Sequence, residues 1–498
     1  MTVVYEINTL VWLRELSARY GRTVRLGDVP GEAWDEIARP GLDTVWLMGV
    51  WERSPAGLAL ALRDPGLLAS FRAALPDLTE ADLAGSPYCV RDYVVDARLG
   101  GPDGLAAARA QLAARGLRLI LDHVPNHVAP DHPWTTGRPG CLIQGTRADL
   151  ERAPDAFLDI AGRVCARGRD PYFPPWPDVV QLNAFSAELR DATVETLVAI
   201  GDQADGVRCD MAMLMTNEVF ARTWGERAGA VPAEDFWPYV LPRVRARHPE
   251  MLFVAEAYWD MEYALQQQGF DHAYDKRLYD RLVHEDAEQI RAHLRAGLGY
   301  QRGLVRFLEN HDEPRAAAAL PGDRERAAAV TVAMLPGATL WHEGQFEGRR
   351  TRLPVFLARR PAEEPDEDLR AFHARLLPAA AAVRRGDWRL LETAGLPGDD
   401  THRALLAWSW SAGDARHLVV VNHSDGTARG RVRLPWEDLR GTGHRLTDLL
   451  TGQSYDRDGD ELADAGLYVE LPARQAHVLA VPVPGAGRDT LRTAAVTA

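Results

Sequence analysis

Eight short apolar runs, each followed by a helical or loop-rich stretch, constrain the fold of this chain more than any other feature. The runs occupy residues 3–8, 44–50, 118–124, 206–212, 252–258, 270–276, 304–310 and 338–344. Between them, residues 103–115, 186–200 and 233–247 repeat Ala, Leu and charged residues at helical spacing. Strands that alternate with helices are typical of a parallel sheet with crossover helices. Eight such units predict an α/β fold, a closed (β/α)8 or TIM barrel.

Two segments depart from this alternation. Residues 128–183 are rich in Pro, Gly and Asp and lack a clear period, which predicts a small inserted subdomain after the third strand. From about Asp387 the chain changes to short alternating runs separated by Gly, Asp and Asn, the pattern of an antiparallel β-sandwich. We therefore expect a barrel domain over 1–385, a C-terminal β-sandwich over 386–484 and a flexible tail over 485–498.

Composition narrows the choice of partners. The 498 residues are 46% hydrophobic, enough for a large core. A formal net charge of −14 disfavours nucleic acid and acidic membranes and leaves a neutral substrate as the easier match. The four cysteines form no metal-type pair and no dense disulfide framework. Because no secretory leader or membrane-length apolar stretch is visible, we expect a soluble cytoplasmic protein, with its oligomeric state left open.

Three acidic residues, Asp210, Glu256 and Asp312, lie at the carboxyl ends of three of the predicted strands. In a (β/α)8 barrel the chemistry lies at the carboxyl ends of the strands, so these side chains are candidates for catalysis. Because side chains alternate along a strand, Arg208 points to the same side as Asp210, and its guanidinium favours the ionised carboxylate. A single acidic residue at a strand end is more often a loop cap or an ion-pair partner. Three together favour a catalytic set.

Glu256 has a different setting from Asp210. It lies in VAEAYW, beside apolar residues and the aromatic Tyr258 and Trp259. Apolar surroundings disfavour a charged carboxylate and raise its pKa, so Glu256 can carry a proton near neutral pH. Retaining glycoside cleavage requires one ionised and one protonated carboxyl group, about 5–5.5 Å apart. The sequence therefore predicts an ionised Asp210 beside a protonated Glu256.

Four motifs at these strand ends resemble the conserved regions of the α-amylase family, glycoside hydrolase family 13. In the order of the family they are DHVPNH (122–127), GVRCDMAM (206–213), VAEAYW (254–259) and FLENHD (307–312). Weaker resemblances are LDTVWL (42–47), PYCVRDY (87–93) and QLN (181–183). The resemblance spans residues 3–345, and the sandwich after it resembles the C-terminal domain of the family.

The resemblance implies a role for each matching residue. Asp210 would be the nucleophile, Glu256 the general acid/base, and Asp312 the group that stabilises the transition state and binds sugar hydroxyls. Arg208 would orient Asp210. Taken singly, histidines in such motifs are more often structural, but the resemblance implies three rings that contact the sugar next to the scissile bond: Tyr88, His127 and His311.

Some positions depart from the family pattern. Met213 stands where α-amylases usually carry Lys or His, which weakens the interpretation as a starch-cleaving endo-amylase. Cys89 replaces a usual Asp, and the stretch 337–345 lacks the Pro and paired aromatic residues common near the eighth strand. Asn126 matches a position that often supports calcium, but no further ligands can be identified in 128–183. We therefore expect no required cofactor and claim no calcium site.

Two further features have alternative interpretations. The basic segment EGRRTR (347–352) is placed to bind a phosphate group, as loops after the last strands do in many barrels, or to pair with the acidic run EEPDED (363–368). We favour the pairing, because surface charge clusters are common. Among the tryptophans near strand ends or in the insertion, Trp259 is the best candidate for contact with substrate. The core interpretation is favoured for Trp51, Trp134 and Trp176.

These expectations converge on an enzyme that opens α-glucosidic bonds of short α-glucosides or α-glucans through a glycosyl–Asp210 intermediate. With water as the acceptor the enzyme is a glycoside hydrolase. With a sugar or phosphate as the acceptor it is a transglycosidase, an isomerase or a phosphorylase. A different class comprises barrels of this family that have lost catalysis and serve as binding subunits, which are expected to lack a catalytic carboxylate. Because all three carboxylates are present, we predict a retaining glycosidase.

Overall fold

In the computed structural model, which describes residues 2–483, the eight predicted apolar runs form one closed parallel barrel. The strands follow one another around the barrel in chain order, and β14 closes onto β1. Their bounds are β1 Val3–Asn8, β2 Thr44–Met48, β5 Arg118–His123, β10 Gly206–Cys209, β11 Leu252–Ala255, β12 His272–Tyr274, β13 Leu304–Arg306 and β14 Ala338–His342. Each strand lies within its predicted run. The predicted TIM barrel is therefore confirmed.

Helices surround the barrel and bury one apolar face each. For example, α8 (Ala187–Gln203) starts after Ser186, whose side chain accepts a hydrogen bond from the Leu189 N–H and caps the helix. The three predicted helices correspond, within three residues at each end, to α5, α8 and α10. Besides α8, the helices around the barrel include α1 Thr9–Tyr20, α2 Gly31–Ile37, α5 Gly101–Ala113, α9 Asn217–Trp224, α10 Phe236–Arg245, α12 Lys276–His284, α13 Ala287–Leu294, α16 Asp323–Met334 and α17 Glu367–Val383.

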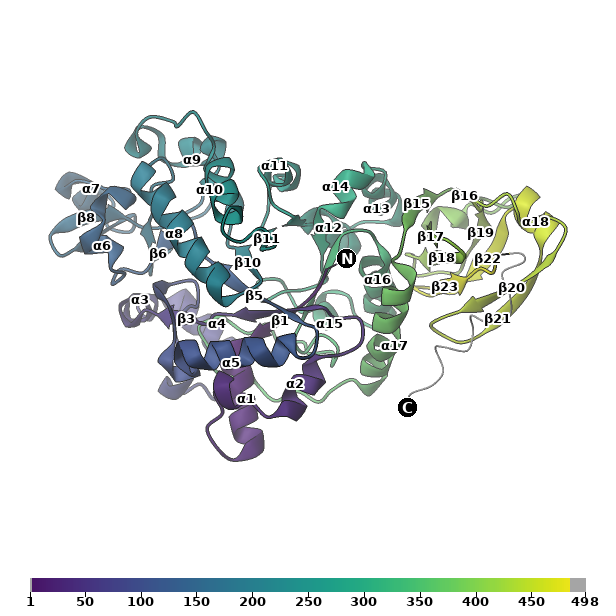
Figure 1. Ribbon diagram of the computed structural model, residues 1–498, viewed down its shortest axis with the longest axis horizontal. Helices are drawn as coiled ribbons and strands as arrows, with labels where there is room; N and C mark the ends of the chain where they lie inside the picture. Colours follow the sequence, from purple (N-terminus) through teal and green to yellow (C-terminus); the bar gives the residue numbers. More distant parts are fainter. Residues whose placement is uncertain (1, 484–498) are drawn as a thin grey trace.

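Two insertions lie on the side of the barrel that faces away from the C-terminal sheets (Figure 1). The expected one follows β5, where β6 (His127–Val128) pairs with β9 (Val180–Gln181) and so closes the loop at its base. This insertion also contains α6 Trp134–Gly137, α7 Arg147–Arg152, β7 Phe157–Ile160 and β8 Arg163–Ala166. The other follows β2 and was not predicted. It contains β3 Trp51–Arg53, α3 Pro55–Ala61, α4 Pro65–Ala74 and β4 Val90–Val95, with β3 paired to β4.

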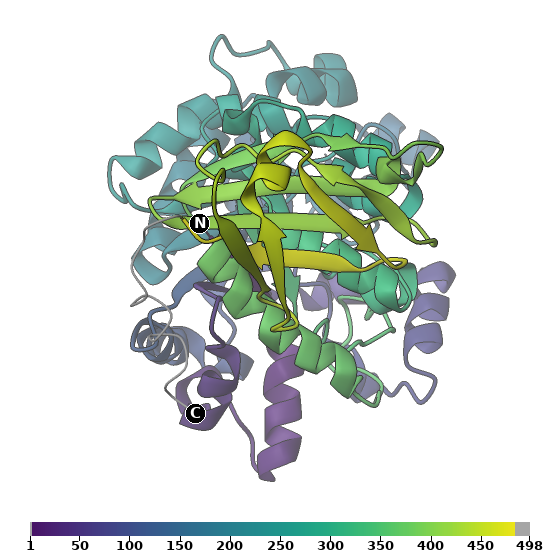
Figure 2. The same ribbon diagram turned by 90° about the vertical axis from the view of Figure 1, so that its right-hand side faces the viewer.

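The C-terminal part forms the predicted antiparallel sandwich, seen face-on in Figure 2. One sheet contains β15 Asp387–Leu391, β17 Leu405–Ala412, β18 Ala415–Asn422, β20 Gly443–Asp448, β21 Ser454–Asp458 and β23 Ala476–Ala480. The other contains β16 Thr393–Ala394, β19 Ala428–Val432 and β22 Leu467–Leu471. Residues from both sheets, such as Leu418 and Val469, share one buried core. The predicted tail over 485–498 lies outside the described residues.

The sandwich is held against the barrel by hydrogen bonds from buried rings. The indole N–H groups of Trp408 and Trp410 both donate to the carbonyl oxygen of Met334 at the end of α16, at 3.1 and 2.8 Å. His423, just after β18, and Thr331 on α16 form another contact, at 2.9 Å. The two parts of the chain therefore share a packed interface.

The four cysteines are buried, and each has a free thiol. Across residues 2–483, we find no helix with the length and apolar character that a membrane span requires.

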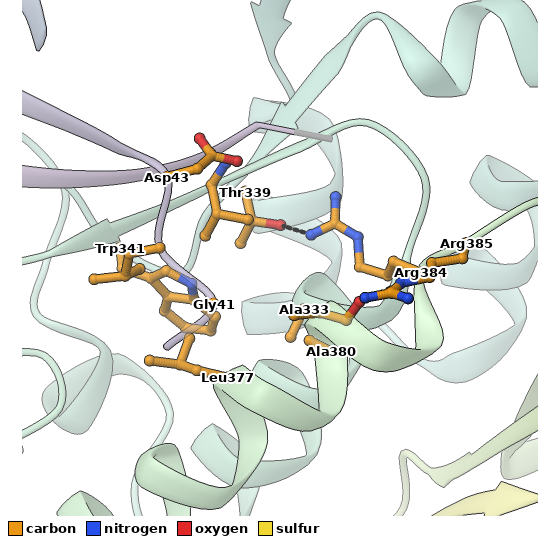
Figure 3. Close-up of a pocket in the computed structure, with 12 residues that line it drawn as sticks. Gly41, Asp43, Ala333, Thr339, Trp341, Leu377, Ala380, Arg384 and Arg385 are labelled. Atoms are coloured by element: carbon orange, nitrogen blue, oxygen red, sulfur yellow. Dashed lines mark hydrogen bonds between the residues drawn. The ribbon is translucent and has the colours of Figure 1, made fainter. Parts of the chain in front are cut away.

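At the amino-terminal end of the barrel, Arg384 ties β14 to α17 (Figure 3). Its guanidinium donates to Thr339 Oγ1 at 2.9 Å and to the carbonyl oxygen of Gly337. The side chain lines a cavity of about 300 Å³ beside Trp341. Burial, reinforced by the charge of Arg306, lowers the pKa of Arg384 to about 10, so the guanidinium stays charged at neutral pH. These charged hydrogen bonds fix the end of α17 against the barrel.

We expect Arg384→Met to destabilise the protein, because it leaves the Gly337 carbonyl and the Thr339 hydroxyl without this donor. The loss of hydrogen bonds from a charged group costs about 1.5–3 kcal/mol. A thermal scan should show a lower Tm than for the matched variant Arg385→Met, whose exposed side chain donates only to Ala381 on the helix surface. Equal Tm values for the two variants would contradict a stabilising role of the Arg384 hydrogen bonds.

Candidate active site

Arg208 on β10 lies at the centre of a buried cluster of charged groups at the carboxyl end of the barrel. Its Nη1 donates to Asp210 Oδ1 at 2.6 Å, and its Nη2 lies 2.7 Å from Glu256 Oε2. Only 1% of the side chain is exposed, and the surrounding carboxylates raise the pKa of Arg208 well above its usual value. One guanidinium therefore holds two carboxyl groups at once.

The strand register explains why these two carboxyl groups meet. Arg208 on β10 lies opposite Val254 on β11, so Asp210 and Glu256, each two residues further on, lie at the same level. Both point to the same side as Arg208, because side chains alternate along a strand. Neighbouring strands are about 4.7–4.9 Å apart. This spacing is close to the separation of about 5–5.5 Å between carboxyl groups that retaining glycosidases use.

Glu256 also accepts two hydrogen bonds. The Met211 N–H donates to Oε2 at 2.6 Å, and the Tyr258 hydroxyl donates to Oε1 at 3.0 Å. Met211 adopts a left-handed conformation with φ of 39°, which is costly for a residue with a side chain and orients this N–H. Burial raises the pKa of Glu256 to about 7; the Arg208 charge opposes this shift, and Asp210 and Asp312 add to it. The rise has the direction that the sequence predicts.

Asp312 lies at the open side of the cluster, with 47% of its side chain exposed. Its Oδ2 is 2.9 Å from His311 Nε2, while Nδ1 of the same ring is 2.5 Å from Glu6 Oε1. Desolvation by the neighbouring groups would raise the pKa of Asp312. The charge of His311 outweighs this desolvation and lowers the pKa of Asp312 to about 2. Burial would lower the pKa of His311, but the charges of Asp312 and Glu6 outweigh burial and raise it well above its usual value.

The other predicted site residues surround the cluster. Tyr88 stacks on His311, with ring centroids 5.1 Å apart, and lies 5.3 Å from the Arg208 guanidinium. Among the described residues its buried hydroxyl has no hydrogen-bond partner. His127 is buried, which lowers its pKa, while the charge of Asp210 acts in the opposite direction. The predicted set is thus brought together, but the role of each residue stays a prediction.

Trp259 lies at the rim, three residues after Glu256. It and Asp260 both have left-handed backbones, with φ of 60° and 61°, and the Asp260 carboxylate pairs with the Arg277 guanidinium at 2.5 and 2.6 Å. The half-buried Trp259 ring packs edge-on against Tyr172 of the insertion, with centroids 4.8 Å apart. The ring therefore joins the β11 loop to the inserted subdomain.

Sequence reasoning missed several residues of the cluster. Glu6 on β1 is fully buried and carries the second contact of His311. Trp46 on β2 and Tyr274 on β12 place their rings within 6 Å of the Arg208 guanidinium. A lone acidic residue within the apolar run VVYEIN was the available signal for Glu6. The aromatic residues had no signal that distinguished them from core residues.

The departures from the family pattern occupy buried positions. Met213 is fully buried in the barrel core, so it offers no polar group to a substrate. The thiol of Cys89 donates to the carbonyl oxygen of Asp178 at 3.1 Å. Asn126 Oδ1 accepts a hydrogen bond from Gln181 Nε2 at 2.9 Å, and the expectation of no required cofactor stays a prediction. Over residues 2–483, no group of three or more His, Cys, Asp and Glu side chains is arranged to hold a metal ion.

The basic segment 347–352 is held by the acidic run mainly through its backbone. Glu363 accepts hydrogen bonds from the N–H groups of Arg350 and Thr351 at 2.7 and 3.3 Å. The favoured pairing of the basic segment with the acidic run is thus present as backbone hydrogen bonds to Glu363. The arginine side chains of the segment contact other residues. Arg352 Nη1 donates to the carbonyl oxygen of Asp312 at 2.7 Å, which places an exposed guanidinium beside the cluster.

Comparisons with known proteins relate this chain to enzymes that act on α-glucans. No protein-family model matches the chain. It is 25% identical over 368 residues to α-amylase MalA of Haloarcula japonica, covering 72% of this chain and 49% of that protein. It is 28% identical over 206 residues to the α-1,4-glucan:maltose-1-phosphate maltosyltransferase of Burkholderia pseudomallei, covering 39% of this chain and 15% of that protein. The chain thus spans half or less of the length of these relatives.

Solved structures share the whole fold. The maltogenic α-amylase AmyB of Thermotoga neapolitana superposes with a TM-score of 0.66 at 18% sequence identity, and the match covers 97% of this chain and 99% of AmyB. At this identity the likeness establishes the fold alone. It extends over both the barrel and the C-terminal sheets.

We predict that Glu256 titrates with a midpoint near 7 and that Tyr258→Phe raises this midpoint. The hydroxyl donates to the carboxylate, so its removal disfavours the charged form, by up to about one pKa unit. Carboxyl-carbon NMR of protein labelled at glutamate measures the midpoint, with Glu256→Gln identifying the signal by difference. Tyr263→Phe, an exposed neighbour, is the control. A midpoint near 4.5, or equal shifts in both Tyr variants, would argue against this electrostatic setting.

Proposed function

We propose that this chain, a member of the α-amylase family, opens α-glucosidic bonds with retention of configuration. Asp210 acts as the nucleophile and Glu256 as the general acid/base. The observation that carries the proposal is the pair of contacts from Arg208 to Asp210 and Glu256, at 2.6 and 2.7 Å. These contacts hold a nucleophile and an acid on neighbouring strands, at the level where retaining enzymes need them.

In the first step the Asp210 carboxylate attacks the anomeric carbon and forms a carbon–oxygen bond. As the glycosidic bond breaks, Glu256 gives its proton to the leaving oxygen. Arg208 then faces a newly formed glutamate. The pKa of about 7 suits this exchange, because burial favours the acid before the step and Arg208 favours the anion after it.

In the second step Glu256 takes a proton from the acceptor hydroxyl. The acceptor oxygen attacks the anomeric carbon and releases Asp210, so that the anomeric configuration is retained. Asp312, 47% exposed and ionised, faces the space where the sugar hydroxyls would lie. The Tyr88 ring, stacked on His311, would contact the same sugar.

The proposed substrates are short α-glucosides or α-glucans, with water as the acceptor in the leading form of the proposal. The buried Met213 supports a substrate other than long starch chains, since this position supplies no polar contact beyond the cleaved bond. Trp259, at the Glu256 side of the site, lies where the leaving or accepting group would be. The carboxylates carry both steps, so the proposed chemistry requires no cofactor.

A second candidate is transfer to or from a phosphate group. The exposed guanidinium of Arg352, bound to the backbone of Asp312, supports it, because arginine binds phosphate well. Maltosyltransferases named for maltose 1-phosphate are among the relatives. In this second candidate, phosphate is the acceptor in the second step in place of water, or the leaving group is a phosphate in the first step.

We further propose a cytoplasmic protein without nucleic-acid or membrane partners. Four free, buried thiols agree with a reducing compartment. The net charge of −14 disfavours binding to phosphate backbones and acidic membranes.

We predict that Glu256→Gln lowers kcat by about 10²–10⁴-fold, the usual contribution of general acid/base catalysis, and that Asp210→Asn abolishes turnover. NMR of reactions with maltose, maltooligosaccharides and trehalose, with and without phosphate, measures the rate, the acceptor and the anomeric configuration of the first product. Glu262→Gln, a buried carboxyl outside the cluster, is the control. Near wild-type turnover in Asp210→Asn, or an inverted first product, would contradict the proposal. Products that form only with phosphate would favour the second candidate.

A further inference from the structure

A basic cleft lies at the junction of the barrel and the sandwich, although the protein as a whole is acidic. It has a volume of about 410 Å³ and is lined by the end of α13, by β15 and β16, and by the short helix η7 (Thr401–Ala404). Figure 1 shows α13 beside β15 and β16 at this junction. The charged and aromatic residues that line it are Arg291, Arg295, Trp388, Glu392, His402 and Arg403.

The three arginines of the cleft have no carboxylate within 4 Å in the described part of the chain. Arg291 donates only to backbone carbonyls, those of Arg403 and Leu405 at 2.9 and 2.7 Å. The guanidinium groups of Arg295 and Arg403 make no hydrogen bond to residues 2–483. Elsewhere on the sandwich, several arginines pair with acidic residues, as in Arg416–Asp438, Arg429–Glu470 and Arg445–Asp456. The cleft instead gathers three arginines that no carboxylate of residues 2–483 pairs with.

These like charges lie close enough to affect one another. Burial lowers the pKa of Arg291, and the charge of Arg295 lowers it further. Glu288, Glu392 and Asp286 act in the opposite direction without cancelling this lowering, and Glu392 is the acidic residue of the lining. An anion in the cleft would relieve this repulsion.

The cleft also offers an apolar surface. The half-buried residues Trp388 and Leu390, on the same side of β15, belong to its lining. A flat ring flanked by guanidinium groups suits a ligand that combines an anionic group with a ring of C–H bonds. Clefts between domains are also frequent sites for small ligands.

We propose that this cleft binds the phosphate group of a sugar phosphate. Guanidinium groups bind phosphate through paired charged hydrogen bonds, which the free donors of Arg295 and Arg403 would supply. The sugar ring would pack against Trp388. None of the catalytic carboxylates lines the cleft, so the site is separate from the proposed active site and does not depend on its function.

Isothermal titration of the full chain tests this site, with inorganic phosphate, glucose 6-phosphate and glucose as probes. The titrations use the Asp210→Asn background, which prevents turnover and keeps the cleft intact. Arg295→Gln and Arg403→Gln each remove one guanidinium group that makes no ion pair or hydrogen bond with residues 2–483. Arg389→Gln is the matched control, because this residue follows Trp388 on β15, points to the opposite side and does not line the cleft.

We expect saturable binding of glucose 6-phosphate at one site per chain, weakened at least about tenfold by Arg295→Gln and by Arg403→Gln. A tenfold loss corresponds to about 1.4 kcal/mol. Arg389→Gln should leave the affinity unchanged, and glucose alone should bind at least about tenfold more weakly. Weaker binding of inorganic phosphate would support the contact of the sugar with Trp388, and equal binding would support a site for phosphate itself. Absence of saturable binding by both phosphate probes, or equal losses in all three Arg variants, would overturn the proposal.

Discussion

The contact of one buried guanidinium with two carboxyl groups is the interaction on which the rest of the site depends. A charge as deeply buried as Arg208 is costly unless carboxylates and hydrogen bonds compensate it. Asp210 and Glu256 supply that compensation, and three aromatic rings pack around the guanidinium. In return, Arg208 fixes the positions of the two groups that the proposed chemistry requires. Removal of Arg208 would leave Asp210 without the cation that compensates its charge.

The surrounding structure supports this arrangement through neighbouring strands. β1 contributes Glu6, which holds His311, and this ring in turn contacts Asp312. The turn after β10 places Met211 in a left-handed conformation that directs its N–H to Glu256. Strain of this kind persists only where the surroundings enforce it, and it is concentrated at functional sites. The barrel therefore positions Asp312 through β1 and Glu256 through the turn after β10.

The barrel strands could be predicted because each is a buried apolar run, and a parallel sheet covered by helices needs such runs. The insertion after β2 escaped prediction because β3 has three residues and β4 is partly exposed, so neither stands out. Alternation along β10 predicted that Arg208 meets Asp210. It could not predict the contact with Glu256, because that contact depends on the register of β10 against β11. The raised pKa of Glu256 followed from its apolar neighbours, whereas the donors Tyr258 and Met211 required the folded backbone.

The most direct test of the account is to trap the sugar on Asp210. Glu256→Gln incubated with α-maltosyl fluoride needs no acid in the first step, because fluoride leaves without a proton, and it lacks the base for the second. We predict that mass spectrometry of the digested protein finds one maltosyl group on the peptide that contains Asp210. A sugar attached to a different residue, or fluoride release at the same rate in the Asp210→Asn, Glu256→Gln double variant, would contradict the assignment of Asp210 as the nucleophile.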